Sequence, residues 1–378
     1  YNIPVALRLK GKLSRRALEE SLSTVLLRHE ALRTYFPVEA GGPVARLGAA
    51  ELPLLVERLP AEAVEARIRQ ESARPFSLAT GPLLRALLIE IAGSDEYVLV
   101  VVMHHIVSDG WSIGVLMREL STAYAAHSEG RAPILPELPI QYGDYAEWQR
   151  AWLEGSARDR QLEYFVKALA GAPTILELPS DRPRPAVRSH RGGAVKVEIP
   201  QATALALAAL GRTQGATLYM SLLSAFGAYL GRISSQDDLI IGSPFAGRRL
   251  AETEGLIGFF VNTLPLRVEL TGDPSFTELL ARVRRQALGA HEHQDLPFER
   301  LVMALEPERV LGTSPIFQVM FALQQTHAGG MGLAGLEVEP ISAESGRAKF
   351  DLSLSLAEGS EGIGGALEYD ADLFDAWR

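Results

Sequence analysis

The fold is decided by the stretch MHHIVSDGWS at residues 103–112. It follows YVLVVV at residues 97–102, an apolar and mostly β-branched run that predicts a fully buried central strand. The apolar residues after the stretch recur at helical spacing, with Ser112 as the expected N-cap. Asp109 and Gly110 are expected to form the turn, since glycine tolerates a positive φ and aspartate can hydrogen-bond to nearby backbone. The sequence therefore predicts two imidazoles on a strand-to-helix turn, from which folds often present functional side chains.

Three interpretations of this histidine pair compete. Both rings can simply be satisfied polar groups at the end of a strand. His104, His105 and Asp109 are also permissible zinc or iron ligands, but no other His, Asp or Glu cluster has ligand-like spacing and the chain has no cysteine, so we predict no metal site. The third interpretation is acid–base chemistry, because the ordinary pKa of imidazole lies nearest neutrality. Successive side chains on a strand point to opposite faces, so we expect one ring to face the reactants.

Length and composition narrow the function. A chain of 378 residues exceeds one ordinary core, so we expect two lobes. Hydrophobic residues make up 47% and charged residues 22%, which is typical of a folded globular protein. A net charge of −9 with no basic block disfavours nucleic acid as a partner. No apolar run reaches the length of a membrane span and no signal-peptide pattern is present, so we expect no membrane partner and a cytoplasmic location, with which the absence of cysteine agrees.

A change in composition divides the chain. Residues 171–193 are rich in proline and arginine, as linkers often are, and they are too many for a simple turn. We therefore predict an N-terminal lobe over residues 1–170, which contains the histidine turn, and a C-terminal lobe over residues 194–378. The stretch between them is expected to connect the two lobes.

Three further elements follow from periodicity and turn signals. Residues 83–90 are expected to form a hairpin with the central strand, and residues 350–356 a second hairpin with residues 365–369. A single helix is predicted to begin at Tyr142 and to run to about Leu169.

The histidine turn resembles the H-H-x-x-x-D-G signature of condensation domains in nonribosomal peptide synthetases, which are relatives of the chloramphenicol acetyltransferase superfamily. Four further segments resemble other motifs of this family, in the family's order: RHEALRTYF at residues 28–36, YGDYAEW at 142–148, IGFFVNTLPLR at 257–267 and HQDLPFE at 293–299. The seventh motif departs from the pattern, because Val310 follows Arg309 where the family usually has Asp. An early family motif rich in Ser, Gln, Arg and Trp and a typical C-terminal helix are not found, so we expect both ends to be trimmed relative to a whole domain.

The resemblance implies an α/β fold. Two chloramphenicol acetyltransferase-like lobes would form a V-shaped pseudo-dimer with the active site in the cleft between them. It also implies a reaction in which an acceptor's α-amine attacks the thioester of a donor acyl group. Both substrates would arrive on the phosphopantetheine arms of donor and acceptor carrier domains, within a synthetase that also holds a neighbouring adenylation domain. The chain itself is then expected to bind no cofactor of its own.

A thioester is already activated, so this reaction needs no nucleophile from the protein. That agrees with a chain that has neither cysteine nor a G-x-S-x-G motif, and it disfavours Ser108 as an acyl acceptor. What the reaction does need is a neutral amine, aligned substrates and stabilisation of the tetrahedral oxyanion.

The resemblance assigns the catalytic role to the second histidine of the motif, which is His105. The expected supporting residues are His104, Asp109, Gly110, Arg248 and Arg33. We predict that Asp109 pairs with Arg248, with Arg33 as the second choice. Candidates for lining the substrate cleft are Trp111, Ser112, Asn262 and Gln294.

The subtype is inferred from the same segments. Cyclising relatives replace the paired histidines with an acidic motif, whereas this chain keeps His104 and His105. The Ile106-Val107-Ser108 filling of the motif favours the subtype that accepts L-configured donors. Two alternatives stay open, namely an epimerising relative, which also keeps the histidine pair, and a non-catalytic module of the same fold that only docks carrier proteins.

Overall fold

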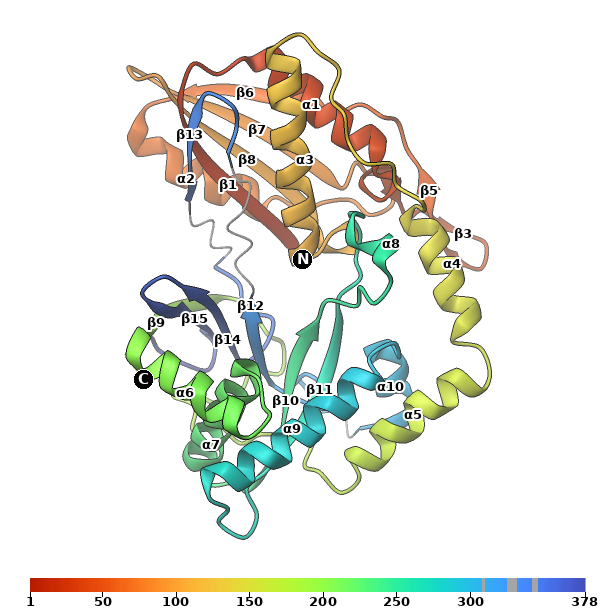
Figure 1. The fold of residues 1–378 in the computed structure, drawn as a ribbon, viewed down its shortest axis with the longest axis vertical. Helices are drawn as coiled ribbons and strands as arrows, with labels where there is room; N and C mark the ends of the chain where they lie inside the picture. The colour runs from red at the N-terminus through yellow and green to blue at the C-terminus, as the bar shows by residue number, and fades with distance from the viewer. Residues whose placement is uncertain (308–309, 325–331, 342–345, 378) are drawn as a thin grey trace. The chain divides into compact units, whose positions relative to one another are not determined.

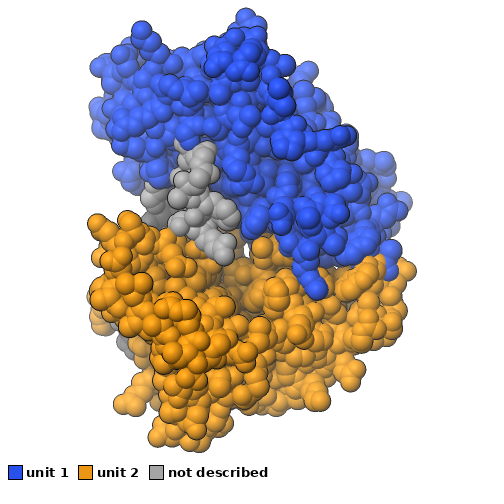
Figure 2. Space-filling model, viewed as in Figure 1, with its two compact units in different colours: residues 1–151, 248–260, 327–345 blue, residues 152–247, 261–326, 346–378 orange. Residues whose placement is uncertain are grey.

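The computed structural model describes residues 1–307, 310–324, 332–341 and 346–377. The chain divides into two compact units, coloured separately in Figure 2. Unit 1 comprises Tyr1–Ala151, Arg248–Phe260 and His327–Ser345, and unit 2 comprises Trp152–Gly247, Val261–Thr326 and Gly346–Arg378. Both units are discontinuous in sequence, whereas the sequence analysis expected one continuous lobe on each side of a linker. The difference arises because two late segments pack with the first part of the chain.

Unit 1 is built on a five-stranded sheet in the order β13-β1-β8-β7-β6 (Figure 1). Its strands are β1 (Asn2–Gly11), β6 (Leu54–Leu59), β7 (Leu84–Ile91), β8 (Glu96–His104) and β13 (Leu336–Ile341). β8 lies in the middle of the sheet and is antiparallel to both β1 and β7, with Leu88 opposite Leu99. The predicted central strand and its hairpin with β7 are therefore confirmed.

The central strand β8 is buried on both faces. Leu99, Val101 and Met103 pack with residues of α1 (Arg15–Arg28) and α3 (Gly110–Ser128), which lie side by side in Figure 1. Val98 and Val100, which point the other way, pack with residues of α2 (Ala61–Ala73). Helices thus cover both faces of the sheet, as the unbroken apolar sequence of β8 requires.

The remaining elements of unit 1 are short. They are η1 (Glu30–Arg33), β2 (Thr34–Tyr35), β3 (Val38–Glu39), β4 (Gly42–Pro43), β5 (Arg46–Leu47), η2 (His105–Val107), α4 (Tyr142–Trp152) and α8 (Ala251–Glu254). The single helix predicted from Tyr142 to Leu169 is wrong, because α4 ends and α5 (Ser156–Ala168) begins after a break. Gly155, the N-cap of α5, lies in that break with φ 76°, a positive value that glycine adopts readily and other residues rarely do.

Unit 2 contains a six-stranded sheet in the order β11-β10-β12-β14-β15-β9. Its strands are β9 (Gly192–Pro200), β10 (Asp238–Phe245), β11 (Asn262–Glu269), β12 (Val319–Gln324), β14 (Leu352–Gly359) and β15 (Gly362–Asp370). Its other helices are α6 (Gln201–Thr213), α7 (Leu218–Ser234), α9 (Phe276–Glu292) and α10 (Phe298–Leu305). β14 and β15 form the predicted second hairpin. The helix α7 is apolar nearly all round and supplies Leu223 and Leu230 to the core.

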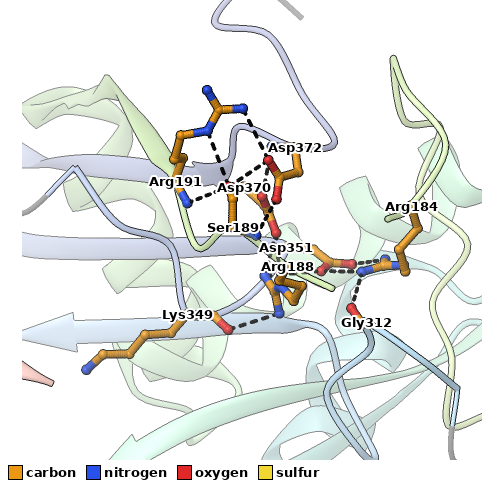
Figure 3. A network of polar contacts seen from close by, with 9 residues as sticks. All are labelled: Arg184, Arg188, Ser189, Arg191, Gly312, Lys349, Asp351, Asp370 and Asp372. Carbon is orange, nitrogen blue, oxygen red and sulfur yellow. Dashed lines mark hydrogen bonds and ion pairs between the residues drawn. The ribbon is translucent and has the colours of Figure 1, made fainter. Parts of the chain in front are cut away.

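The proline- and arginine-rich segment at residues 171–193 is part of unit 2, where two of its arginines pair with buried carboxylates (Figure 3). Arg184 Nη1 lies 2.9 Å from Asp351 Oδ1, and Arg188 Nη2 lies 2.7 Å from Asp370 Oδ2. Both aspartate side chains are only 1% exposed. The composition suggested a linker between lobes, but the arginines hold the segment against β14 and β15.

Candidate active site

The histidine turn places its two imidazoles on opposite sides of the chain. β8 ends at His104, whose Nδ1 accepts a hydrogen bond of 3.0 Å from the N–H of Ile106 in the short helix η2. The His104 ring lies 6.1 Å from the ring of Phe76. The His105 ring instead lies 5.0 Å from Phe259, edge to face. The expectation that the two rings diverge is therefore confirmed.

The tautomer of His105 follows from one contact. Its Nδ1 lies 2.8 Å from the backbone oxygen of Ser108. Because a carbonyl oxygen can only accept a hydrogen bond, Nδ1 carries the proton, so that the lone pair lies on Nε2 whenever the ring is neutral. Ser108 itself is fully buried, which agrees with its rejection as an acyl acceptor. The turn thus holds His105 in the form in which Nε2 can accept a proton.

Asp109, and not Ser112, is the N-cap of α3. The Asp109 Oδ1 accepts hydrogen bonds from the N–H of Ser112 at 2.8 Å and from its hydroxyl at 2.7 Å. Oδ2 accepts from the N–H of Phe260 at 3.0 Å. The expected positive φ at Gly110 is not found either, because this residue begins the helix. Aspartate and serine are both good N-caps, so propensity did not separate two candidates three residues apart.

Arg248 completes the environment of this carboxylate. Its Nη2 lies 3.2 Å from Asp109 Oδ1 and 2.9 Å from Ser112 Oγ, so the predicted ion pair is present. Its Nη1 donates to the backbone oxygens of Thr253 and Leu256, the latter at 2.8 Å. Burial lowers the pKa of the Arg248 guanidinium, and the charge of Asp109 and its hydrogen bond offset part of that effect. The pair therefore joins α3 to the Arg248–Phe260 segment.

Two candidates for the substrate cleft have structural contacts in unit 1. Ser112 is fully buried, and its hydroxyl also accepts from the N–H of Gly258 at 3.1 Å, so its side chain makes structural contacts within unit 1. Trp111 is partly buried, and its Nε1 donates to the backbone oxygen of Glu254 at 2.9 Å, which ties α3 to α8. Arg33, the second choice as partner of Asp109, has a buried Nε without a hydrogen-bond partner among the described residues.

Three residues near this site did not emerge from the sequence analysis as functional candidates. His29 and Glu119 form a buried pair, with Nε2 and Oε2 2.8 Å apart. The Tyr142 hydroxyl donates to the backbone oxygen of Phe259 at 2.7 Å, and burial raises the pKa of that hydroxyl. A signal for Glu119 was present, because helical spacing places it three residues after Leu116 and thus on the apolar face of α3.

The other two cleft candidates lie in unit 2 and hold one turn together. Asn262 Nδ2 donates to the backbone oxygens of Gln294 and Leu296, at 2.8 and 2.7 Å. Its Oδ1 accepts from the N–H of Phe298 at 3.1 Å. The Gln294 side chain is buried and donates to the backbone oxygen of His291 at 2.7 Å. These contacts order the turn before α10 from within unit 2.

The described residues hold no group of three or more His, Cys, Asp or Glu side chains that could bind a metal ion. In the same part of the chain, no helix is both long and apolar enough to cross a membrane. Arg309, from the divergent seventh motif, lies outside the described residues.

Comparison with protein families gives one consistent result. The family model described as "Condensation domain" matches residues 1–377. One of the proteins that make up the linear gramicidin synthase of Brevibacillus parabrevis is 48% identical over 385 residues, which cover 99% of this chain and 5% of that protein. Phosphinothricin tripeptide synthetase of Streptomyces viridochromogenes is 41% identical over 389 residues, which cover 100% of this chain and 32% of that protein. The chain therefore spans a minor part of these curated relatives.

Solved structures agree with this result. The X-domain from teicoplanin biosynthesis matches with a TM-score of 0.90 and 32% identity, over 99% of this chain and 86% of that one. A four-domain nonribosomal peptide synthetase bound to AMP and glycine matches with a TM-score of 0.88 and 25% identity, over 100% of this chain and 30% of that one. The mixed α/β architecture of both units is thus the one found in condensation-domain structures.

Proposed function

The chain belongs to the condensation-domain family of nonribosomal peptide synthetases, and we propose that it joins a donor aminoacyl or peptidyl thioester to the α-amine of an acceptor aminoacyl thioester. Members of this family form amide bonds. The observation that carries the proposal for this chain is the state of His105, whose Nδ1–H donates to the Ser108 carbonyl and whose Nε2 bears the lone pair. A side chain held in this way can take a proton from an amine.

The proposed reaction balances without an added reagent. The acceptor nitrogen attacks the thioester carbonyl carbon, so that a C–N bond forms and the C–S bond then breaks. His105 Nε2 accepts the proton that the nitrogen loses, and the same proton passes to the departing thiolate. An α-amine has an ordinary pKa near 8, so little driving force is needed for transfer to an imidazole. The products are an amide on the acceptor carrier and a free thiol on the donor carrier.

The partners are part of this proposal. Both substrates would arrive as thioesters on phosphopantetheine arms of donor and acceptor carrier domains, so the chain would need no cofactor of its own. A neighbouring adenylation domain would supply the activated amino acids. We place the reaction in the cytoplasm, in agreement with a chain that contains no cysteine.

The donor stereochemistry is proposed from the histidine turn. Ile106, Val107 and Ser108, which lie between the motif histidines and Asp109, favour an L-configured donor. The Trp111-Ser112 continuation and the segment at residues 258–263 favour condensation over epimerisation. A second candidate function is the docking of carrier domains or other proteins without catalysis. The similarity to the X-domain that is solved in complex with OxyB from teicoplanin biosynthesis favours that alternative.

A direct assay separates these functions. The purified chain is mixed with a donor carrier loaded from a panel of L- or D-amino acids and an acceptor carrier loaded with an L-amino acid. We expect an L,L-dipeptide on the acceptor carrier, detected by mass and chiral analysis, at a rate above that of the loaded carriers alone. Release of the donor to water, or inversion of a stereocentre without amide formation, would contradict the proposal. Binding of both carriers without any product would support the docking function.

A further inference from the structure

A charged cluster is buried between α1 and α3, which lie side by side in Figure 1. Glu119 of α3 accepts hydrogen bonds from Arg28 Nε at 2.9 Å and from His29 Nε2 at 2.8 Å. The His29 side chain is 1% exposed and that of Glu119 11%. Burial opposes ionisation of Glu119, but the hydrogen bonds from His29 and Arg28 and the charge of Arg28 outweigh it and hold the pKa of Glu119 below its usual range.

The second ring nitrogen of His29 has a different partner. Its Nδ1 lies 3.3 Å from the backbone nitrogen of Ile257. A backbone N–H can only donate, so Nδ1 must be unprotonated, and the proton of the neutral ring lies on Nε2, facing Glu119. His29 therefore connects Glu119 on one side to the Arg248–Phe260 segment on the other.

Ile257 begins a run of four residues that all contact the first part of the chain within unit 1. Its side chain is buried in the same core as α1 and α3. The N–H of Gly258 donates to the hydroxyl of Ser112 at 3.1 Å. Phe259 packs its ring against His105, and the N–H of Phe260 donates to Asp109. A continuous chain of contacts thus leads from His29 to the imidazole of His105.

We propose that His29 is a positioning residue for the reaction of His105. By accepting a hydrogen bond from the Ile257 N–H, it fixes the position of the backbone at the start of residues 257–260. It thereby keeps the Phe259 ring against the His105 imidazole. This inference rests on the proposed function, in which His105 Nε2 accepts the proton of the amine. His29 itself touches no reacting atom.

A purely structural role predicts something different. In that case His29 would serve only to satisfy the buried carboxylate of Glu119, and its bond to Ile257 would not affect the reaction. The two contacts can be removed separately, because asparagine and glutamine each imitate one ring nitrogen. In His29→Asn, Oδ1 replaces Nδ1 as acceptor for Ile257, but the side chain is too short to reach Glu119. In His29→Gln, the amide nitrogen replaces Nε2 as donor to Glu119, but the acceptor for Ile257 is lost.

The test compares these two variants by the kinetics of amide formation on loaded carriers, below the melting temperature of each. We expect His29→Gln to melt lower than the parent, because the buried Ile257 N–H loses its acceptor. We also expect it to lower kcat by about five- to tenfold with an unchanged KM for the carriers, as for one lost neutral hydrogen bond. We expect His29→Asn to melt lower but to keep kcat within about twofold. A His29→Gln variant with the parent's kcat, or a His29→Asn variant that loses as much as His29→Gln, would overturn the inference.

A spectroscopic readout separates failure of this inference from failure of the proposed function. Long-range ¹H–¹⁵N spectra of histidine-labelled protein report the tautomer of each ring. We expect the His105 signals to shift or broaden in His29→Gln and to remain in place in His29→Asn. If the parent forms no amide but the signals behave in this way, the proposed function fails and the positioning role stands. If the parent is active and His29→Gln leaves both rate and signals unchanged, the positioning role fails.

The parent protein provides a test that does not depend on the folding of any variant. The same spectra must show His29 protonated at Nε2 and unprotonated at Nδ1. A His29 ring that is protonated at Nδ1, or at both nitrogens, at the pH of the assay would overturn the inference.

Discussion

The carboxylate of Asp109 and the guanidinium of Arg248 form a buried ion pair across 139 positions of the sequence, with Oδ1 and Nη2 3.2 Å apart. Their side chains are 3% and 1% exposed. The pair joins the first turn of α3 to the segment that follows β10. It therefore holds in place the turn that contains His105.

Breaking this pair should lower the free energy of unfolding far more than removing a surface pair does. Asp109→Ala leaves the buried Arg248 charge uncompensated, which costs roughly 3–5 kcal/mol, and Arg248→Ala should share the defect. Glu65→Ala, which removes an exposed pair with Arg69, serves as the control and should cost less than about 1 kcal/mol. Urea unfolding gives each value. A stable, fully folded Asp109→Ala protein without activity would instead make Asp109 a direct participant.

Glu119 should make stability depend on pH in the acid range. Its pKa is lower in the folded protein than the ordinary value of 4.5, so the unfolded chain binds its proton first as the pH falls. The contribution of Glu119 is therefore complete above about pH 4.5 and is lost as the pH falls through the folded-state pKa. We expect Glu119→Gln to be less stable at neutral pH, because Arg28 loses its counter-charge, and to lose less stability between pH 5 and pH 3. Parallel curves for parent and variant over that interval would contradict this assignment.

The hydrogen bonds of Asn262 should stabilise the turn before α10. Asn262→Ala removes the hydrogen bonds to Gln294, Leu296 and Phe298 and should cost about 1–3 kcal/mol in urea unfolding. Asn262→Asp should cost more at neutral pH, because a carboxylate oxygen then faces two carbonyl oxygens. Lowering the pH should reduce the difference in unfolding free energy between the two variants, because the new carboxyl group becomes protonated. An aspartate variant that equals the parent at neutral pH would show that this turn does not depend on the amide donor.

The arginine-rich segment of unit 2 offers a matched comparison within Figure 3. Arg188 donates from Nε and Nη2 to Asp370 and from Nη1 to the Lys349 carbonyl, a fork that lysine cannot reproduce. Arg188→Lys should cost about 1.5–3 kcal/mol. Arg191→Lys, at a side chain that is 75% exposed, should change stability by less than about 0.5 kcal/mol. Equal thermal melting of the two variants would show that the segment is not held by these buried pairs.

Local patterns predicted the core of the site well. An unbroken apolar run predicted β8. His104 and His105 diverge as predicted, but strand alternation is not the reason, because His104 ends the strand and His105 begins η2. The partner of Asp109 was predicted as Arg248, the first of two choices, and the ion pair is present. The predicted N-cap, Ser112, was wrong because serine and aspartate have similar capping propensities. Only the hydrogen bond from the N–H of Phe260, a residue distant in sequence, favours the carboxylate of Asp109.

Contacts between distant segments explain what the sequence did not predict. β13 pairs with β1 although more than 300 residues separate them, so no local change in composition marks that boundary between units. His29 and Glu119 are 90 positions apart. Each also has an ordinary local explanation, because a histidine is common at the end of a helix and a glutamate is common within one. The arginines at residues 182–191 have the composition of a linker, and the buried aspartates that hold them lie on the last two strands of the sheet or next to them.

The central claim is that His105 supplies chemistry and not stability. Its Nδ1 contact is to a backbone carbonyl of its own turn, which carries no charge. His105→Ala should therefore fold as the parent does. His190→Asn, at an exposed residue with φ 58° that asparagine tolerates, is the matched control for loss of an imidazole.

The decisive measurement is the single-turnover rate of amide formation from loaded donor and acceptor carriers, taken together with the melting temperature of each protein. The account predicts that His105→Ala melts within about 1 °C of the parent and forms the amide at least about a hundredfold more slowly, while His190→Asn keeps the parent's rate. A folded His105→Ala protein that forms the amide at the parent's rate would contradict the central claim.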